Sequence, residues 1–289
     1  MIDKSGVYGF PRLSPDGKRL ALAVYRDKGW SIWVRDLAKG TMSQLTFDGS
    51  ASYPAWTPDG RYLFYSAADG IYLIRADGAS TPRRILEIAG YPESVSPDGR
   101  RLAYYVPTES KERDIWIAPL EGTGDGLRAG KPEPFAVTAA DEIQPVFSPD
   151  GKWIAYASSE SEDNFGVYVR PAAGGPGKWL VSPGVYAAWP VWAPSGHRLF
   201  FFNAPGGKLM AVDYTVNGES FVAGAAKNFP TAQILPNGNA PVYFVSGNGD
   251  RVGAVLAPQT GKDSGRSRYT LFLNYLDEIR RLGAKAAVR

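Results

Sequence analysis

The tetrapeptide Ser-Pro-Asp-Gly recurs along this chain, and its recurrence limits the possible folds more than any other feature. It stands at positions 14–17, 96–99 and 148–151, with a one-residue variant at 57–60 and degenerate copies at 193–196 and 246–250. The marker residues are spaced 43, 39, 52, 45 and 53 positions apart: Asp16, Asp59, Asp98, Asp150, Ser195 and Asn248. Repeats of about 40–50 residues are typical of units that each hold four short strands and their connections.

Strand-like and turn-like segments alternate within each unit. A short apolar run precedes each tetrapeptide, and alternating strands follow it, as at 152–158 and 167–170. Proline sets one φ angle of the turn, and glycine accepts a positive φ angle. We therefore predict an all-β fold, a six-bladed β-propeller of four-stranded antiparallel blades. One domain would span residues 1–289, with blades near 7–47, 48–88, 89–139, 140–184, 185–228 and 229–275.

Composition excludes several classes of protein. The 289 residues include no cysteine, which excludes a disulfide framework, a thiolate zinc site and a cysteine nucleophile. The net charge of +3 is too small to predict a nucleic-acid partner. No apolar run is long enough to predict membrane insertion, and the first residues lack the apolar core of a signal peptide. We expect a soluble protein and leave its compartment open.

The repeat units resemble those of the TolB-like propellers, which are related to WD-type repeats. The resemblance is strongest between Asp141 and Asp213, where residues 144–156 are followed by the strand 167–170. Residues 269–275 also resemble the tail of propeller domains attached to bacterial receptor-like serine/threonine kinases, although the chain has no kinase signature. The resemblance implies the propeller fold. It leaves the activity open, because such propellers include binding modules, accessory domains and enzyme appendages.

The two ends of the chain pose the question of how the ring closes. Few residues precede the first strand, and the sixth unit has no clear fourth strand. We predict that a strand from the opposite end completes the last blade, or that the blade stays one strand short. A terminal helix is expected at about 275–284, because Leu276, Ile279 and Leu282 share one face and acidic residues precede basic ones.

A propeller sorts its polar residues between two faces. The Asp-Gly turns lie on one face, so their aspartates are expected to serve the turns rather than a metal. His197, the only histidine, falls in such a turn, and no Gly-x-Ser-x-Gly motif is present. A serine-hydrolase triad is therefore not expected.

Acidic residues gather in the loops of the opposite face, most densely in the fourth unit. This set comprises Asp141, Glu142, Glu160, Glu162, Asp163 and Asn164. Oxygen ligands of this kind suit Ca²⁺, so we expect a calcium site here, with Glu142 or Glu160 as a catalytic base if the protein is an enzyme. The alternative is that these loops are simply charged, since lysines and arginines lie among the acids.

Aromatic and amide side chains precede the inner strands at the same mouth of the channel. Tyr53, Tyr91, Gln144 and Trp189 are the predicted ligand-binding residues, with packing between blades as the alternative role for the rings. We predict a binding module for a small molecule or peptide. The second hypothesis is a calcium-dependent hydrolase of lactones or esters, such as N-acyl homoserine lactones.

Overall fold

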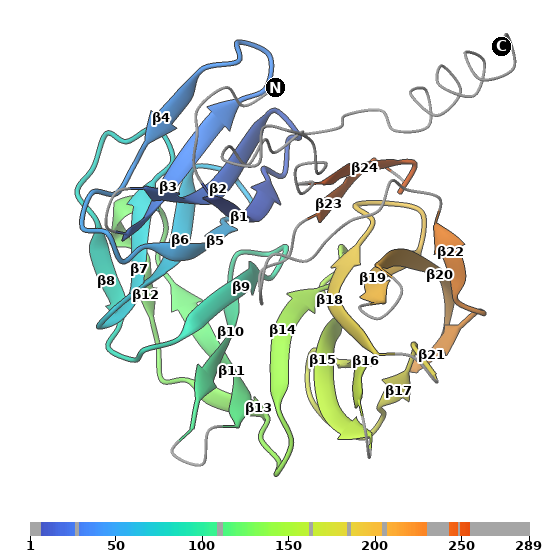
Figure 1. Ribbon diagram of the computed structural model, residues 1–289. Coiled ribbons are helices and arrows are strands. Elements are labelled where there is room, and N and C mark those ends of the chain that lie inside the picture. Colours follow the sequence, from blue (N-terminus) through green and yellow to red (C-terminus); the bar gives the residue numbers. More distant parts are fainter. Residues whose placement is uncertain are drawn as a thin grey trace, which may run out of the picture.

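The computed structural model describes residues 7–26, 29–108, 112–161, 164–183, 186–203, 207–229, 243–247 and 249–254. Within these ranges the protein is all-β, apart from one short 3₁₀ turn, η1 (Gly124–Gly126). Six antiparallel sheets lie around a central channel (Figure 1), an arrangement consistent with a six-bladed propeller. No helix in the described ranges has the length and apolar character needed to cross a membrane.

Each sheet is built from strands that follow one another in the chain. The first two sheets contain β1 (Val7–Leu13), β2 (Arg19–Arg26), β3 (Gly29–Asp36) and β4 (Met42–Gln44), then β5 (Ser52–Trp56), β6 (Tyr62–Ala67), β7 (Gly70–Arg75) and β8 (Arg83–Leu86). The third contains β9 (Tyr91–Val95), β10 (Arg101–Pro107), β11 (Arg113–Glu121), β12 (Arg128–Ala129) and β13 (Glu133–Ala136). The fourth contains β14 (Glu142–Phe147), β15 (Trp153–Ser161), β16 (Asn164–Pro171) and β17 (Trp179–Leu180).

The last two sheets complete the series. The fifth contains β18 (Ala187–Trp192), β19 (Arg198–Asn203), β20 (Lys208–Asn217), β21 (Ser220–Ala223) and β22 (Lys227–Phe229). The sixth contains β23 (Tyr243–Ser246) and β24 (Arg251–Ala254).

The third and fifth sheets depart from the predicted four strands, because each has five. Their third strands, β11 and β20, are nine and ten residues long. Each is long enough to pair with two short strands along its outer edge: β12 and β13 in one case, β21 and β22 in the other. These are the two units with the longest marker spacings, 52 and 53 residues, so the added length covers the outer edge of each sheet.

The ring closes between the first and sixth sheets. The inner strands contact one another in the order β1, β5, β9, β14, β18 and β23, and β23 returns to β1. The sixth sheet has two strands within the described ranges. The predicted closing strand and the predicted helix at 275–284 lie outside the described residues, so both stay predictions.

The repeated turns have the hydrogen bonds that turn chemistry predicts. The Ser14 hydroxyl donates to Asp16 Oδ1 at 2.5 Å, and the same oxygen accepts the N–H of Lys18 at 3.1 Å. Ser96 with Asp98 and Ser148 with Asp150 repeat the first contact at 2.5 Å. The aspartates thus serve the turns, which agrees with the sequence-based interpretation.

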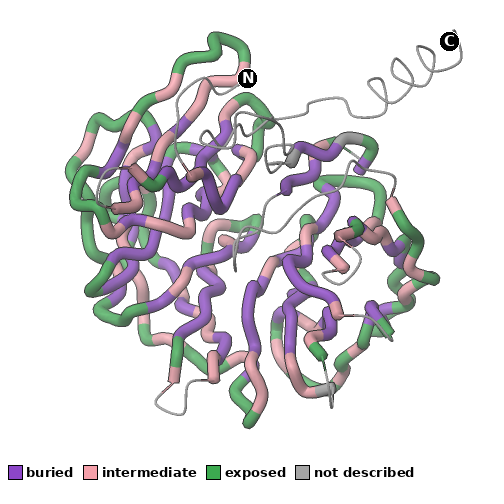
Figure 2. The backbone as a smooth tube through the Cα atoms, viewed as in Figure 1, coloured by how far each residue is buried: buried purple, intermediate pink, exposed green. Residues whose placement is uncertain are grey.

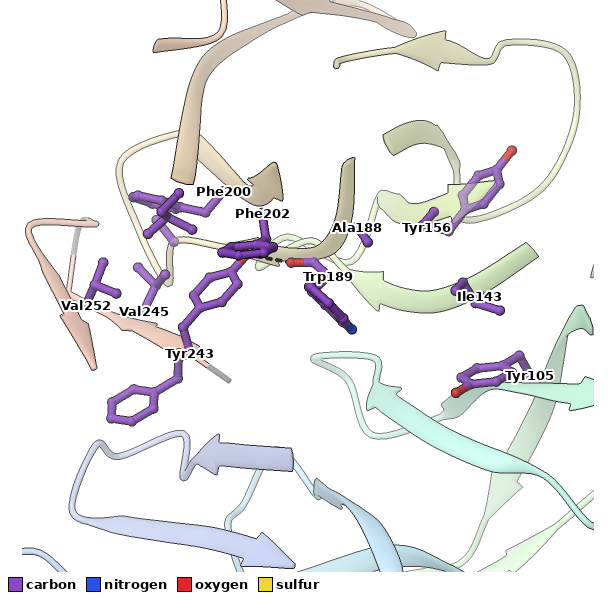
Figure 3. Packing of buried hydrophobic residues seen from close by; sticks show 14 of the residues in the cluster. Tyr105, Ile143, Tyr156, Ala188, Trp189, Phe200, Phe202, Tyr243, Val245 and Val252 are labelled. Carbon is purple, nitrogen blue, oxygen red and sulfur yellow. Dashed lines mark hydrogen bonds between the residues drawn. The ribbon is translucent and has the colours of Figure 1, made fainter. Parts of the chain in front are cut away.

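Burial follows the radial order of the strands (Figure 2). Every residue of β6, the second strand of its sheet, is buried, whereas the outermost strands such as β4 and β8 are largely half-buried or exposed. One core cluster joins the first, third, fourth, fifth and sixth sheets, and Phe200, Phe202 and Tyr243 are among its members (Figure 3). This packing rigidly positions the inner strands around the channel.

Candidate functional site

A cavity of about 790 Å³ occupies the channel on the side of the Asp-Gly turns. Arg12, Glu93, Gln144, Trp189 and Tyr243 lie in its wall, on inner strands of five different sheets. Prolines of five of the repeated turns form its rim: Pro15, Pro58, Pro97, Pro149 and Pro194. The cavity therefore has a proline rim and a mainly apolar wall that holds a few polar side chains.

Four inner strands share a strained bulge beside this cavity. Phe10, Tyr53, Gln144 and Trp189 have φ angles between 52° and 60°, in the left-handed region that side chains rarely adopt. Each precedes a proline, which normally favours extended backbone at the preceding residue. Such a conformation costs on the order of 1–3 kcal/mol per residue and is concentrated at binding and catalytic sites. The bulge occurs at the same place in four sheets, and two of its four positive-φ residues, Gln144 and Trp189, line the cavity.

The third unit carries the same bulge with different residues. In the first, second, fourth and fifth sheets, two residues of the inner strand, the second a proline, lie opposite one residue of the neighbouring strand. In β9 the pairing with β10 passes from Pro92 to Ser94, and Glu93 has no paired residue opposite it. Pro92 and Glu93 therefore form the bulge in this strand. Glu93 therefore stands where the repeat otherwise has Pro11, Pro54, Pro145 and Pro190, which directs a carboxylate into the cavity wall.

Arg12 reaches from β1 to form an ion pair with Glu93 Oε2. The Glu93 side chain is 1% exposed and the Arg12 side chain 19%. Burial raises the pKa of the Glu93 carboxyl, and Arg12 opposes that increase. The other carboxylate oxygen, Oε1, has no hydrogen-bond partner among the described residues. A buried acceptor without a partner is costly, so it is a candidate contact for a ligand.

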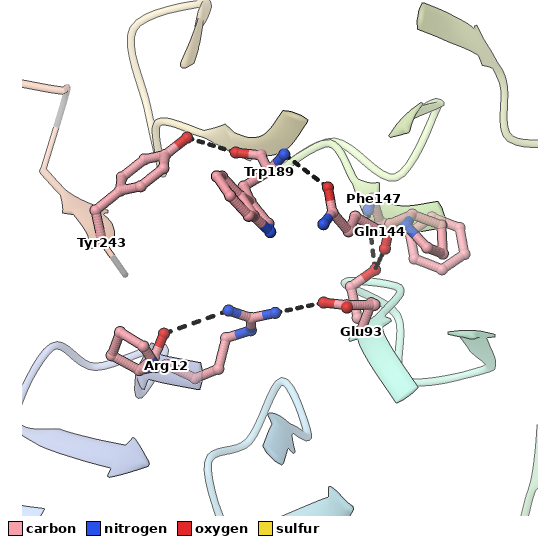
Figure 4. Close-up of polar contacts among 9 residues, drawn as sticks. Arg12, Glu93, Gln144, Phe147, Trp189 and Tyr243 are labelled. Carbon is pink, nitrogen blue, oxygen red and sulfur yellow. Dashed lines mark hydrogen bonds and ion pairs between the residues drawn. The ribbon is translucent and has the colours of Figure 1, made fainter. Parts of the chain in front are cut away.

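Hydrogen bonds between neighbouring inner strands hold the rest of the cavity wall in place (Figure 4). Gln144 Oε1 accepts the backbone N–H of Trp189 at 2.7 Å, and the Tyr243 hydroxyl donates to the Trp189 carbonyl. The Ser94 hydroxyl accepts the N–H of Phe147 at 3.0 Å and donates to the carbonyl of Pro145 at 3.1 Å. These contacts join neighbouring sheets and hold the polar groups of the cavity in place.

The four predicted ligand-binding residues divide into two pairs. Gln144 and Trp189 line the cavity. Tyr53 and Tyr91 do not; their ring centroids are 4.7 Å apart, within an aromatic stack that includes Phe10 and Tyr105. Burial raises the pKa of Tyr53 to about 12. Both rings thus pack between blades, the alternative role considered from the sequence, and their role in ligand binding stays a prediction.

Of the six predicted calcium ligands, three are held by other partners, two lie outside the described residues and one is exposed. Arg113 Nε donates to Asp141 at 2.8 Å, Lys178 pairs with Glu160, and Thr138 donates to Glu142. Glu162 and Asp163 lie outside the described residues, and Asn164 is exposed at the start of β16. The part of the chain that is described contains no group of three or more acidic, histidine or cysteine residues able to hold a metal ion.

Unpartnered acidic oxygens nevertheless lie near that loop face. Glu142 and Asp114 are buried, and each has one oxygen without a partner among the described residues. Burial raises the pKa of both carboxyls, and neighbouring acids add to the increase.

His197 is exposed in the turn before β19, where its ring contacts that of Tyr214, and it does not line the cavity.

Two cavity residues, Arg12 and Glu93, were not predicted from the sequence. The available signal was a shifted proline: Pro92 lies four residues before Ser96, whereas the corresponding prolines of four other repeats lie three residues before the turn. The shift leaves Glu93 at the position that proline occupies elsewhere.

Comparison with known proteins places the fold among TolB-like β-propellers. The uncharacterized peptidase YuxL of Bacillus subtilis is 27% identical over 195 residues, covering 53% of this chain and 29% of that protein. A TolB homolog of Chlorobium luteolum is 31% identical over 119 residues, covering 39% of this chain and 27% of that protein. The crystal structure of TolB from Acinetobacter baumannii aligns with a TM-score of 0.62 at 20% identity, covering 79% of this chain and 55% of that one.

The chain thus spans less than a third of the length of these two relatives. No family model matches it. The comparisons give no support to the expected likeness to kinase-attached propellers.

Proposed function

We propose that this protein is a binding module and that its ligand, a small molecule or peptide, enters the channel from the side of the Asp-Gly turns. One observation carries the proposal: a cavity of about 790 Å³ whose wall holds a buried carboxylate oxygen without a partner among the described residues. Ligand sites are typically concave, mostly apolar and furnished with a few fixed polar groups.

The location differs from the mouth expected from the sequence. At the loop face, Asp141 and Glu160 are already neutralised by Arg113 and Lys178. The buried, unpartnered oxygens of Glu142 and Asp114 at that face do not line the cavity, whereas Glu93 at the turn face does. A ligand in the cavity can satisfy this buried acceptor without displacing an established ion pair.

Filling the cavity with a larger side chain tests whether the ligand binds there. Val191 lines the cavity on β18, so Val191→Trp would occupy the space that a ligand needs. Val222→Trp is the matched control, because Val222 is 50% exposed on the outer strand β21. A fragment library screened by ligand-observed NMR and a displayed heptapeptide library should yield ligands for the wild type and Val222→Trp. Equal binding by a folded Val191→Trp protein would contradict the proposal.

The second candidate is a calcium-dependent hydrolase of lactones or esters, with Glu142 or Glu160 as base. It is favoured by the unpartnered buried oxygens of Glu142 and Asp114. Turnover of a lactone panel with and without a chelator tests it: chelator-sensitive turnover that Glu142→Gln abolishes would support a hydrolase, and no turnover would exclude these substrates.

A further inference from the structure

We propose that the Arg12–Glu93 pair makes the channel select a ligand with an uncharged polar head group, such as a carboxamide or hydroxyl, over a charged one. The inference rests on the proposed binding function and names the chemistry of its ligand. It is carried by the ion pair, the unpartnered oxygen of Glu93 and the fixed amide of Gln144.

Charge is the first reason for this selectivity. Opposite charges lie together in the cavity wall, where a low local dielectric strengthens each of their interactions. A ligand cation near Glu93 Oε1 meets Arg12, and a ligand anion near Arg12 meets Glu93. Asp16 is the remaining charged residue among the described cavity-lining residues; it lies exposed at the rim, and Ser14 and the N–H of Lys18 hold its carboxylate.

Hydrogen bonding is the second reason. Glu93 Oε1 offers an acceptor. Because Gln144 Oε1 accepts the N–H of Trp189, the Gln144 amide nitrogen is left as a donor, and it points towards the space between Trp189 and Arg12 (Figure 4). Carboxamides and hydroxyls both donate and accept, whereas a carboxylate only accepts and an amidinium only donates. An uncharged head group therefore matches both walls at once.

The rest of the cavity suits an apolar body attached to that head. Trp56, Phe147 and Trp192 line it below the proline rim. The indole N–H of Trp56 donates to the Arg12 carbonyl at 2.8 Å, and that of Trp192 to the Val146 carbonyl at 3.0 Å. These rings are thereby held in position, and an aromatic or alkyl group next to the head would pack against them.

Three probes with one shape and different charges test the proposal: benzamide, benzoate and benzamidinium. Dissociation constants would be measured by ligand-observed NMR on the whole chain, with thermal melting to confirm that every variant is folded. We expect benzamide to bind wild-type protein at least tenfold more tightly than either ion. Equal or tighter binding of an ion, or no binding of any probe, would overturn the proposal.

Two variants should each increase the affinity for one of the two charged probes. Glu93→Gln frees Arg12, so benzoate affinity should rise at least tenfold; Arg12→Met frees Glu93, so benzamidinium affinity should rise similarly. Arg128→Met, which breaks an exposed pair with Glu121, is the control and should leave the order unchanged.

The results separate this inference from the proposed function. If the order of the probes is unchanged in both variants, but Val191→Trp still abolishes binding, the selectivity is wrong and the binding site stands. If Val191→Trp has no effect on any ligand, the proposed function fails as well.

Discussion

The two ends of the channel differ in how far their ion pairs are buried: the loop end lies around Asp141 and Glu160, and the turn end lies on the side of the Asp-Gly turns. At the loop end, Arg113 pairs with Asp141 and Lys178 with Glu160, and all four side chains are between 23% and 41% exposed. At the turn end, Arg12 pairs with a carboxylate that is 1% exposed and keeps one oxygen without a partner among the described residues. The turn end thus holds the more deeply buried ion pair. Buried carboxylate oxygens without a partner among the described residues occur at both ends, in Glu93 at the turn end and in Glu142 and Asp114 at the loop end, but only Glu93 lines the cavity.

The largest expected effect on the free energy of unfolding comes from truncating Trp192 in the cavity wall at the turn end. Trp192 is buried between Tyr214 and Phe221 and bonded to the Val146 carbonyl. Trp192→Ala should lower the free energy of unfolding by about 3–5 kcal/mol, measured by urea denaturation. Trp192→Phe keeps a ring and loses the hydrogen bond, so it should cost less. Similar values for the two variants would show that packing of the ring is not what holds this wall.

Breaking the ion pair at the turn end should have the next largest effect. Arg12→Met leaves the Glu93 carboxylate buried without its partner, which should cost about 3 kcal/mol at pH 8. Burial already raises the pKa of Glu93 above its unfolded value, and loss of Arg12 raises it further. The penalty applies to the ionised form, so it should shrink as the pH falls through the folded-state pKa and vanish below the unfolded one.

Urea denaturation of Arg12→Met and wild type at pH 8 and pH 5 checks this sign. A penalty that stays constant, or grows, at the lower pH would contradict the role given to the Glu93 charge.

Breaking an ion pair at the loop end should matter much less. Arg113→Gln removes the partner of Asp141 where both side chains are about one-quarter exposed, so the loss should be below about 1 kcal/mol. The wild-type contribution should also weaken in 1 M salt, because exposed charges are screened. A loss as large as that of Arg12→Met would remove the contrast between the two ends.

The smallest effect is expected at His197. Its ring is exposed beside Tyr214 and does not line the cavity. His197→Ala should change the affinity for benzamide by less than about twofold, because the residue has no contact with the ligand to lose. A tenfold change would place the ligand nearer to this turn than the cavity does.

The repeat was sufficient to predict the fold, but most residues of the candidate site could not be predicted from it. The tetrapeptide fixes each turn through local bonds such as Ser14 to Asp16, so its recurrence was sufficient to predict the sheets. The long spacings before Asp150 and Asn248 also held the signal for the additional strands β13 and β22.

The site depends on contacts between distant residues. Arg12 and Glu93 are 81 positions apart, and neither belongs to a local motif. Their meeting requires the closed ring and the bulge register in β9, which the repeat pattern does not specify. Gln144 and Trp189 share the residue-before-proline position, and both lie in the cavity wall at the turn end, although they were predicted at the opposite mouth; their role in ligand binding stays a prediction. Tyr53 shares that position too, but its ring packs with Phe10 and Tyr91.

Indole N–H signals provide the most direct measurement of where a ligand binds. Of the eight tryptophans, Trp56, Trp189 and Trp192 line the cavity, whereas Trp153 and Trp179 pack together on the fourth sheet. During titration of ¹⁵N-labelled protein with benzamide, we expect saturable shifts of the three cavity indoles and none of the other two. Shifts confined to Trp153 and Trp179, or unchanged cavity indoles at saturation, would contradict binding at the turn end of the channel.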